Sequence, residues 1–122
     1  MDNYRQIIRG MRDSMIRIRN DYLEELQDCP EGSLWKTDQN GRTCYYWAHR
    51  EGDGYVRKVI SDDIGMQRRL ARKAYLLKSL KLLDRNIYQL GRALNGMEPL
   101  ESGAVVARLT KAYQDLPGEY FM

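Results

Sequence analysis

Few side chains in this sequence are of the types that carry catalysis, and their spacing does not favour it. The single histidine, His49, falls five residues after Cys44 in a segment typical of a β-strand. Side chains alternate between the two faces of a strand, so an odd separation points these two apart. Without a bulge they form neither a catalytic dyad nor a metal site. The sequence contains no CxxC, HExxH, P-loop or GxGxxG motif. We therefore expect no enzymatic activity, no bound metal and no cofactor.

The residues that favour binding lie between positions 33 and 60, where aromatic and basic side chains are interleaved. Tyr45 and Trp47 occupy one face of an expected strand, and Cys44 and Tyr46 occupy the other. Aromatic rings beside cations suit stacking on bases and contact with phosphates, and an antiparallel ribbon can enter the major groove of DNA. One face must pack on the helices, so the opposite face is the candidate site.

A second candidate surface is the basic segment that follows. Residues 62–95 hold eight basic and three acidic residues, and Asp84 is the one acid beyond the start of the expected helix. Basic stripes beside a heptad seam are also typical of salt bridges between helices, but the shortage of acids favours an anionic partner. One such stripe is Lys78, Lys81, Arg85 and Arg92. The predicted site comprises the sheet residues and the densest basic cluster: Trp35, Lys36, Arg42, Tyr45, Trp47, Arg50, Tyr55, Arg57, Lys58, Arg68, Arg69, Arg72 and Lys73.

Length and composition place the chain among small globular proteins. Its 122 residues suit one domain, and a 43% hydrophobic, 30% charged composition with a net charge of +3 is typical of a folded, water-exposed chain. No apolar run approaches the ~20 residues that span a bilayer, and the N-terminus lacks the layout of a signal peptide. We expect a cytoplasmic protein without a membrane partner, in which Cys29 and Cys44 are reduced thiols.

Two long helices are predicted from apolar residues at alternating steps of four and three. Residues 3–28 and residues 62–95 each carry such a heptad seam, which buries its stripe in a core or against another long helix. The seam of the first helix consists of Tyr4, Ile8, Met11, Met15, Ile18 and Tyr22. The seam of the second consists of Leu76, Leu80, Leu83, Ile87, Leu90 and Leu94.

The remaining elements complete an α+β fold. Residues 33–60 predict a three-stranded antiparallel β-meander, with turns at Asn40-Gly41 and near Gly52. Residues 103–115 predict a short C-terminal helix that covers what the other elements leave exposed. We expect one domain, 1–122, built as a long antiparallel helical hairpin with the meander between its helices. Two seams in one chain are also compatible with a homodimer.

The meander carries a resemblance to known proteins. It rests on four short runs followed by the basic helix: PEGSL at 30–34, NGR at 40–42, YYW at 45–47 and REG at 50–52. Together they resemble a module of uncharacterised bacterial and phage proteins, some of which continue into a restriction-nuclease-like domain that we do not expect in these 122 residues. The order of sheet and helix is similar to the arm-type DNA-binding domains of phage integrases. In size and charge layout the chain resembles phage anti-CRISPR proteins.

Three functions are compatible with these observations. The first is a non-enzymatic binding protein of a phage or mobile element that engages nucleic acid or a nucleoprotein, such as an anti-CRISPR-like inhibitor of a host nuclease defence complex. The second is a DNA-binding accessory factor that uses the meander, whose affinity for DNA falls steeply with salt. The third is a helical adaptor that dimerises through its seams.

Overall fold

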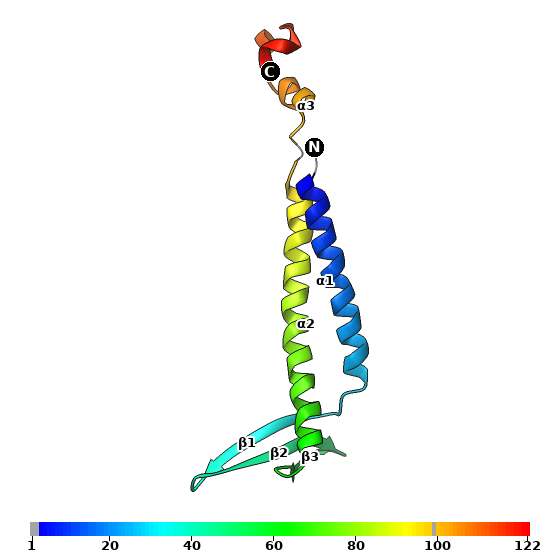
Figure 1. Cartoon of the computed structure of the whole chain (residues 1–122), viewed down its shortest axis with the longest axis vertical. Coiled ribbons are helices and arrows are strands. Elements are labelled where there is room, and N and C mark those ends of the chain that lie inside the picture. Colours follow the sequence, from blue (N-terminus) through cyan, green and yellow to red (C-terminus); the bar gives the residue numbers. More distant parts are fainter. Residues whose placement is uncertain (1–2, 99) are drawn as a thin grey trace.

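Two long helices form the body of the protein, and a small sheet lies at one end of them (Figure 1). The computed structural model describes residues 3–98 and 100–122. Helix α1 spans Asn3–Gln27 and helix α2 spans Ile64–Gly96, so α2 is about 50 Å long. The two helices lie side by side and run in opposite directions. The predicted α+β class and the long helix are confirmed.

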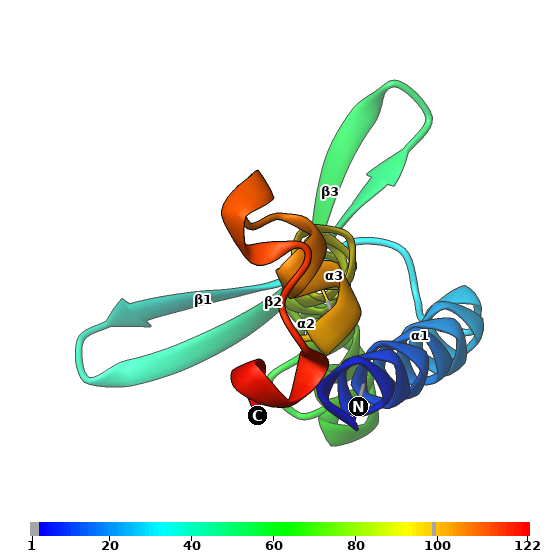
Figure 2. The same ribbon diagram turned by 90° about the horizontal axis from the view of Figure 1, so that it is seen from above.

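The sheet is a three-stranded antiparallel meander, as predicted. Strand β1 spans Ser33–Gln39, β2 spans Arg42–Glu51 and β3 spans Gly54–Val59, in the order β1-β2-β3. The first turn places Asn40 and Gly41 at φ 50° and 75°, the left-handed region that this residue pair tolerates. Viewed along α2, the two hairpins of the sheet point in different directions from the start of that helix (Figure 2).

The junction between the sheet and α2 is fixed by side-chain hydrogen bonds. Asp63 caps the helix, because its Oδ1 accepts the backbone N–H of Met66 at 3.0 Å. Gln67 Nε2 donates to the carbonyl oxygens of Ile60 and Ser61, at 2.8 and 3.0 Å. Ile60 is itself buried. These contacts set the direction in which α2 leaves the sheet.

The interface between the helices is narrow. Leu76, Leu80 and Leu94 of the predicted α2 seam are buried, whereas no residue of α1, all of which is described, is fully buried. Met11 and Ile18 were expected in the seam of the first helix, but both are exposed, so this part of the prediction is wrong. Two helices alone cover one stripe of each other, and the stripe on α1 is centred elsewhere. None of the described helices is apolar enough over a sufficient length to cross a membrane.

Polar contacts hold α1 and α2 together at mid-length and at the end away from the sheet. Arg19 Nε donates to Asp84 Oδ1 at 2.5 Å. At the far end, Arg5 Nη1 donates to the carbonyl oxygen of Met97 at 2.7 Å, and the Tyr4 hydroxyl donates to that of Glu98 at 2.8 Å. The pairing therefore has one register along its length.

The C-terminal segment differs from its prediction. Helix α3 spans only Ser102–Ala107, and two short 3₁₀ turns follow, η1 at Lys111–Tyr113 and η2 at Gly118–Phe121. The helix expected over 103–115 is too long because a short segment gains little helical stability without a packing partner. The segment lies beyond the far end of the hairpin, so it does not cover the exposed surface there as expected (Figure 1).

Gly32 gives a stability prediction for the crossing between α1 and β1. Its φ is +92°, and an added Cβ would lie 2.2 Å from the carbonyl oxygen of Ala48. Gly41 has φ +75° but open space around the same position. Gly41→Ala should cost about 1 kcal/mol of strain, and Gly32→Ala roughly 2 kcal/mol more. Urea denaturation of both variants measures this, and equal losses would contradict the close packing at Gly32.

Candidate nucleic-acid interface

One face of the sheet is open to solvent and carries paired arginines and rings. Trp35 and Tyr55 are exposed large side chains, and their partners Arg50 and Arg57 are exposed as well. The Arg57 guanidinium lies 4.1 Å from the centre of the Trp35 ring, and that of Arg50 lies 5.6 Å from the Tyr55 ring. We call this surface the exposed sheet face; its predicted binding residues are Trp35, Arg42, Arg50, Tyr55 and Arg57.

Strand register explains how the tryptophan meets its arginine across the whole sheet. Trp35 on β1 is paired with Tyr46 of β2, and Arg57 on β3 is paired with Ala48 of β2. The side chain of Ala48 is small, so the arginine can extend over the central strand to the ring, and Ala48 is buried. A guanidinium held over a ring keeps N–H donors that can contact phosphate.

The other predicted sheet residues lie on the opposite face. Tyr45 and Trp47 point there and are half-buried, together with the exposed Lys36 and Lys58. The Trp47 indole donates to the carbonyl oxygen of Glu31 at 2.7 Å. The ring of Trp47 therefore helps to fix the chain that enters the sheet. The structure thus separates the predicted sheet residues into two sets that cannot meet one flat ligand together.

Cys44 and His49 lie on opposite faces of β2, as their odd separation requires. The Ser61 hydroxyl donates to Cys44 Sγ at 3.4 Å. This hydrogen bond, followed by one with Tyr46, lowers the pKa of the Cys44 thiol. The two side chains cannot act together in catalysis, and the half-buried thiol lies on the same side of β2 as Arg42 and Arg50, next to Ser61 in the turn that leads to α2.

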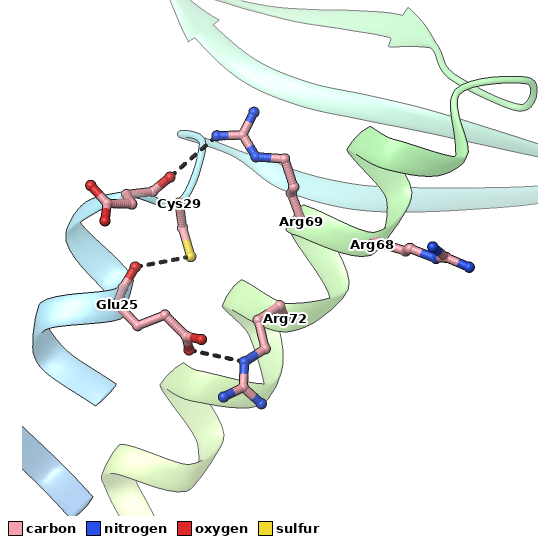
Figure 3. Close-up of a pocket in the computed structure, with 6 residues that line it drawn as sticks. Glu25, Cys29, Arg68, Arg69 and Arg72 are labelled. Atoms are coloured by element: carbon pink, nitrogen blue, oxygen red, sulfur yellow. Dashed lines mark hydrogen bonds and ion pairs between the residues drawn. The ribbon is translucent and has the colours of Figure 1, made fainter. Parts of the chain in front are cut away.

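The basic cluster at the start of α2 serves mainly to hold the chain crossing from α1 to β1. Arg69 Nη2 donates to the carbonyl oxygen of Asp28 at 3.2 Å, and Lys73 Nζ donates to that of Gly32 at 3.0 Å. Both donors satisfy backbone groups that regular structure leaves without a partner. Arg68 points away from them (Figure 3). Three of the four predicted residues in this cluster are therefore engaged in internal contacts.

Arg72 forms the most connected contact in this region. Its Nε donates to Glu25 Oε2 at 2.9 Å, and this hydrogen bond raises the pKa of Arg72 (Figure 3). The guanidinium also lies 5.5 Å from the Tyr22 ring and 5.2 Å from the Tyr75 ring. A cavity of about 250 Å³ is lined by Arg68, Arg69, Arg72, Glu25, Asp28 and Cys29. Two carboxylates in that lining offset two of its three arginines, so the cavity carries only a small excess of positive charge.

A second positive surface lies further along α2, on the side turned away from α1. Lys78 stands two residues from both Leu76 and Leu80, about 200° around the helix from these buried side chains. Spacings of three, four and seven residues place three further exposed cations on the same side. We call this set the outer stripe: Lys78, Lys81, Arg85 and Arg92.

The outer stripe has no acidic partner within residues 3–98 and 100–122. Asp84 is the single acid of α2, and Arg19 of α1 binds it. Arg92 lies 6.0 Å from the Tyr88 ring, which adds an aromatic group to the stripe. A groove of about 470 Å³ lies beside it, and its lining combines Leu77 and Leu80 with Lys78 and Lys81 and includes Asp84, which Arg19 binds. Two cations and one paired acid beside apolar side chains can bind phosphate together with a sugar or base.

The outer stripe was visible in the sequence, but it was not among the predicted site residues. The cluster at the start of α2 was predicted instead, because its cations are closer together in the sequence. The stripe is identified by the scarcity of acids on α2. This helix contains one acid, Asp84, and the structure shows that Arg19 binds it. Comparison with protein-family models, with curated proteins and with solved structures finds no match. The resemblances drawn from the meander therefore stay predictions.

The Arg72 contacts predict a difference between neighbouring arginines. Arg72→Ala removes the bond to Glu25 and the contacts with two tyrosine rings, so it should lower Tm by a few degrees. Arg68→Ala removes an exposed side chain of the same type without a described hydrogen bond and should leave Tm unchanged. Thermal unfolding followed by circular dichroism compares the two, and equal Tm values would show that the Arg72 contacts do not tie α1 to α2.

Proposed function

We propose that this chain is a non-catalytic nucleic-acid-binding protein that contacts phosphates through the outer stripe and bases through the exposed sheet face. The observation that carries the proposal is the engagement of Asp84 by Arg19, which leaves four cations on one side of α2 without a described acid. Four cations within about 21 Å of helix match the repeated charge of a nucleic-acid backbone. The arginine-bound rings of the sheet add a sequence-tolerant stacking surface.

The sign of the charge bears on the kind of nucleic-acid protein that we propose. A nuclease holds its nucleic acid in a positively charged channel, and a protein that blocks such a channel needs an acidic face. The outer stripe is basic. We propose that the chain is a phage or mobile-element protein. If it acts as an anti-CRISPR-like inhibitor of a nuclease complex, it would therefore contact the nucleic acid that the complex holds.

The salt dependence of binding tests the role of the outer stripe. We expect the protein to bind a labelled 20-nucleotide single strand or duplex at low salt, with a steep loss of affinity as salt rises. In the double variant Lys81→Ala/Arg85→Ala, the slope of log K against log salt should become shallower by about 2, because each phosphate contact contributes about 0.9. Fluorescence anisotropy at a series of salt concentrations measures both quantities.

Arg17→Ala is the matched control for this experiment. Arg17 is an exposed cation on α1 that lies four residues from both Asp13 and Asp21, outside the outer stripe. Its loss should leave the salt slope nearly unchanged. Absence of binding at low salt, or the same slope in all three proteins, would refute the proposal and favour the adaptor function.

Stacking on the exposed sheet face is tested separately. Trp35→Ala should weaken binding to single-stranded DNA by about 1–3 kcal/mol, the range for loss of one stacked base. Val59→Ala shortens another exposed side chain on the same face without removing a ring, so it should leave the affinity unchanged. Titration of both variants at one salt concentration measures the difference. If Trp35→Ala binds like the parent, the sheet does not contact the nucleic acid.

Capture from bacterial lysate distinguishes free nucleic acid from a nucleoprotein. The tagged protein is incubated with lysate, with and without nuclease treatment, and the bound proteins are identified. Partners that are lost after nuclease treatment are held through the nucleic acid, which the proposal predicts. Partners that resist the treatment would indicate direct protein contact, as expected of an inhibitor that binds the nuclease itself.

A further inference from the structure

A row of exposed apolar side chains follows one edge of the α1–α2 hairpin. On α1, Ile7, Met11 and Ile18 are 62%, 46% and 42% exposed, and on α2, Tyr75 and Leu82 are each 56% exposed. We call these five residues the apolar edge. Large apolar side chains scattered singly need no explanation, but several of them on one side of a helix pair indicate an interaction surface.

Contacts and spacing place these five residues on the same side of the hairpin. The rings of Tyr22 and Tyr75 meet edge to face, with centroids 6.5 Å apart, so both mark one edge. Ile18 lies one turn before Tyr22, and Met11 lies seven residues before Ile18. Leu82 lies seven residues after Tyr75 and reaches the level of Ile18, because the neighbouring Arg19 binds Asp84. The edge is therefore contributed by both helices along most of the length of α1.

The surface area of the chain is too large for a compact monomer. A folded protein of 14.4 kDa is expected to expose about 6,800 Å², whereas this chain exposes 9977 Å². The difference of roughly 3,000 Å² per chain exceeds the ~1,000–2,500 Å² that each chain of a stable homodimer buries, so a dimer interface accounts for much of it. Among the residues that the structure describes, the core consists of six buried apolar side chains, Ala48, Ile60, Leu70, Leu76, Leu80 and Leu94, and α1 contributes none of them. A chain with so small a core gains stability when the uncovered edge meets a second apolar surface.

We propose that the apolar edge packs against the same edge of a second copy, which forms an antiparallel four-helix bundle. A twofold axis brings identical patches together, and an edge of large apolar side chains is complementary to itself. Lys78 borders the edge, three residues after Tyr75 and four residues before Leu82. The antiparallel orientation follows from charge. Residues 3–19 of α1 hold five basic residues and one acidic residue, whereas residues 20–31 hold five acidic residues and no basic one. An antiparallel pair places the basic part of each α1 beside the acidic part of the other.

The oligomeric state and two matched variants test this inference, which does not depend on nucleic-acid binding. Sedimentation velocity should give a dimer of the 14.4 kDa chain at micromolar concentration. Ile18→Glu places a carboxylate without a partner at the interface of both copies and should weaken association about 100-fold or more. Leu77→Glu changes a side chain of similar exposure (45%) that lies outside the apolar edge and should leave the dimer intact. Circular dichroism of each variant establishes that the helices are retained.

A monomeric parent protein, or equal dissociation of both variants with helices intact, would overturn the inference. Orientation is measured by a spin label at Gln27→Cys, in a background with Cys29→Ser and Cys44→Ser. An antiparallel bundle centred near Ile16 separates the two labels by about 33 Å along its axis, since each lies eleven residues from the centre. Labels at the same end of the bundle, about 20 Å apart, a distance of two helix diameters, would overturn the antiparallel arrangement.

Discussion

Two helices that pack only on each other can each bury one stripe, and this geometric constraint decides what α1 and α2 present to their surroundings. The buried stripe of α2 contains Leu76, Leu80 and Leu94. Most of the remaining circumference of both helices faces outward. Two kinds of side chain occupy this outward-facing surface. Cations without a described acidic partner lie on the side of α2 away from α1, and apolar side chains lie along one edge shared by the helices. Both surfaces exist because no third long helix covers them.

The same pairing determines which cations are available to a partner. The chain crosses from α1 to β1 in residues 28–32, and backbone carbonyls in this crossing lack partners in regular structure. Arg69 and Lys73 lie close enough to donate to them, and Arg72 meets Glu25 at the end of α1. Cations further along α2 have no crossing beside them and no acid except Asp84. Distance from the crossing therefore separates arginines with a structural role from those that stay free.

Local sequence signals predicted much of the fold, because its elements depend on neighbours in the chain. Asn40-Gly41 gives the first turn, strand alternation gives the two faces, and Asp63 caps α2. What failed depends on tertiary context. The seam of α1 includes Met11 and Ile18 only if a partner covers them, and the C-terminal segment continues as a helix only if it packs on the hairpin.

The candidate site was predicted only in part, for a similar reason. Trp35 and Tyr45 lie on different strands, so their faces can be compared only when the pairing of β1 with β2 is known. That pairing places Trp35 opposite Tyr46 and therefore on the other face from Tyr45. The approach of Arg57 to Trp35 across Ala48 also needs both strand pairings. For α2, composition showed that acids are scarce, but it could not show that Arg19 takes the single one. Identifying the free cations required the helix pairing itself.

The two proposed surfaces adjoin on α2, because Lys78 lies three residues after Tyr75 and four residues before Leu82. Most of the apolar edge belongs to α1, and Lys81, Arg85 and Arg92 lie about 60–100° around α2 from Leu82, so packing through the edge leaves these three cations exposed in both copies. A twofold axis relates the two stripes of the bundle. One stripe of four cations gives only weak, salt-sensitive affinity for a polyanion. Linking two stripes makes the second contact intramolecular and raises the overall affinity wherever the geometry allows both to bind. Such a dimer is suited to joining two segments of nucleic acid, or two turns of a bent one.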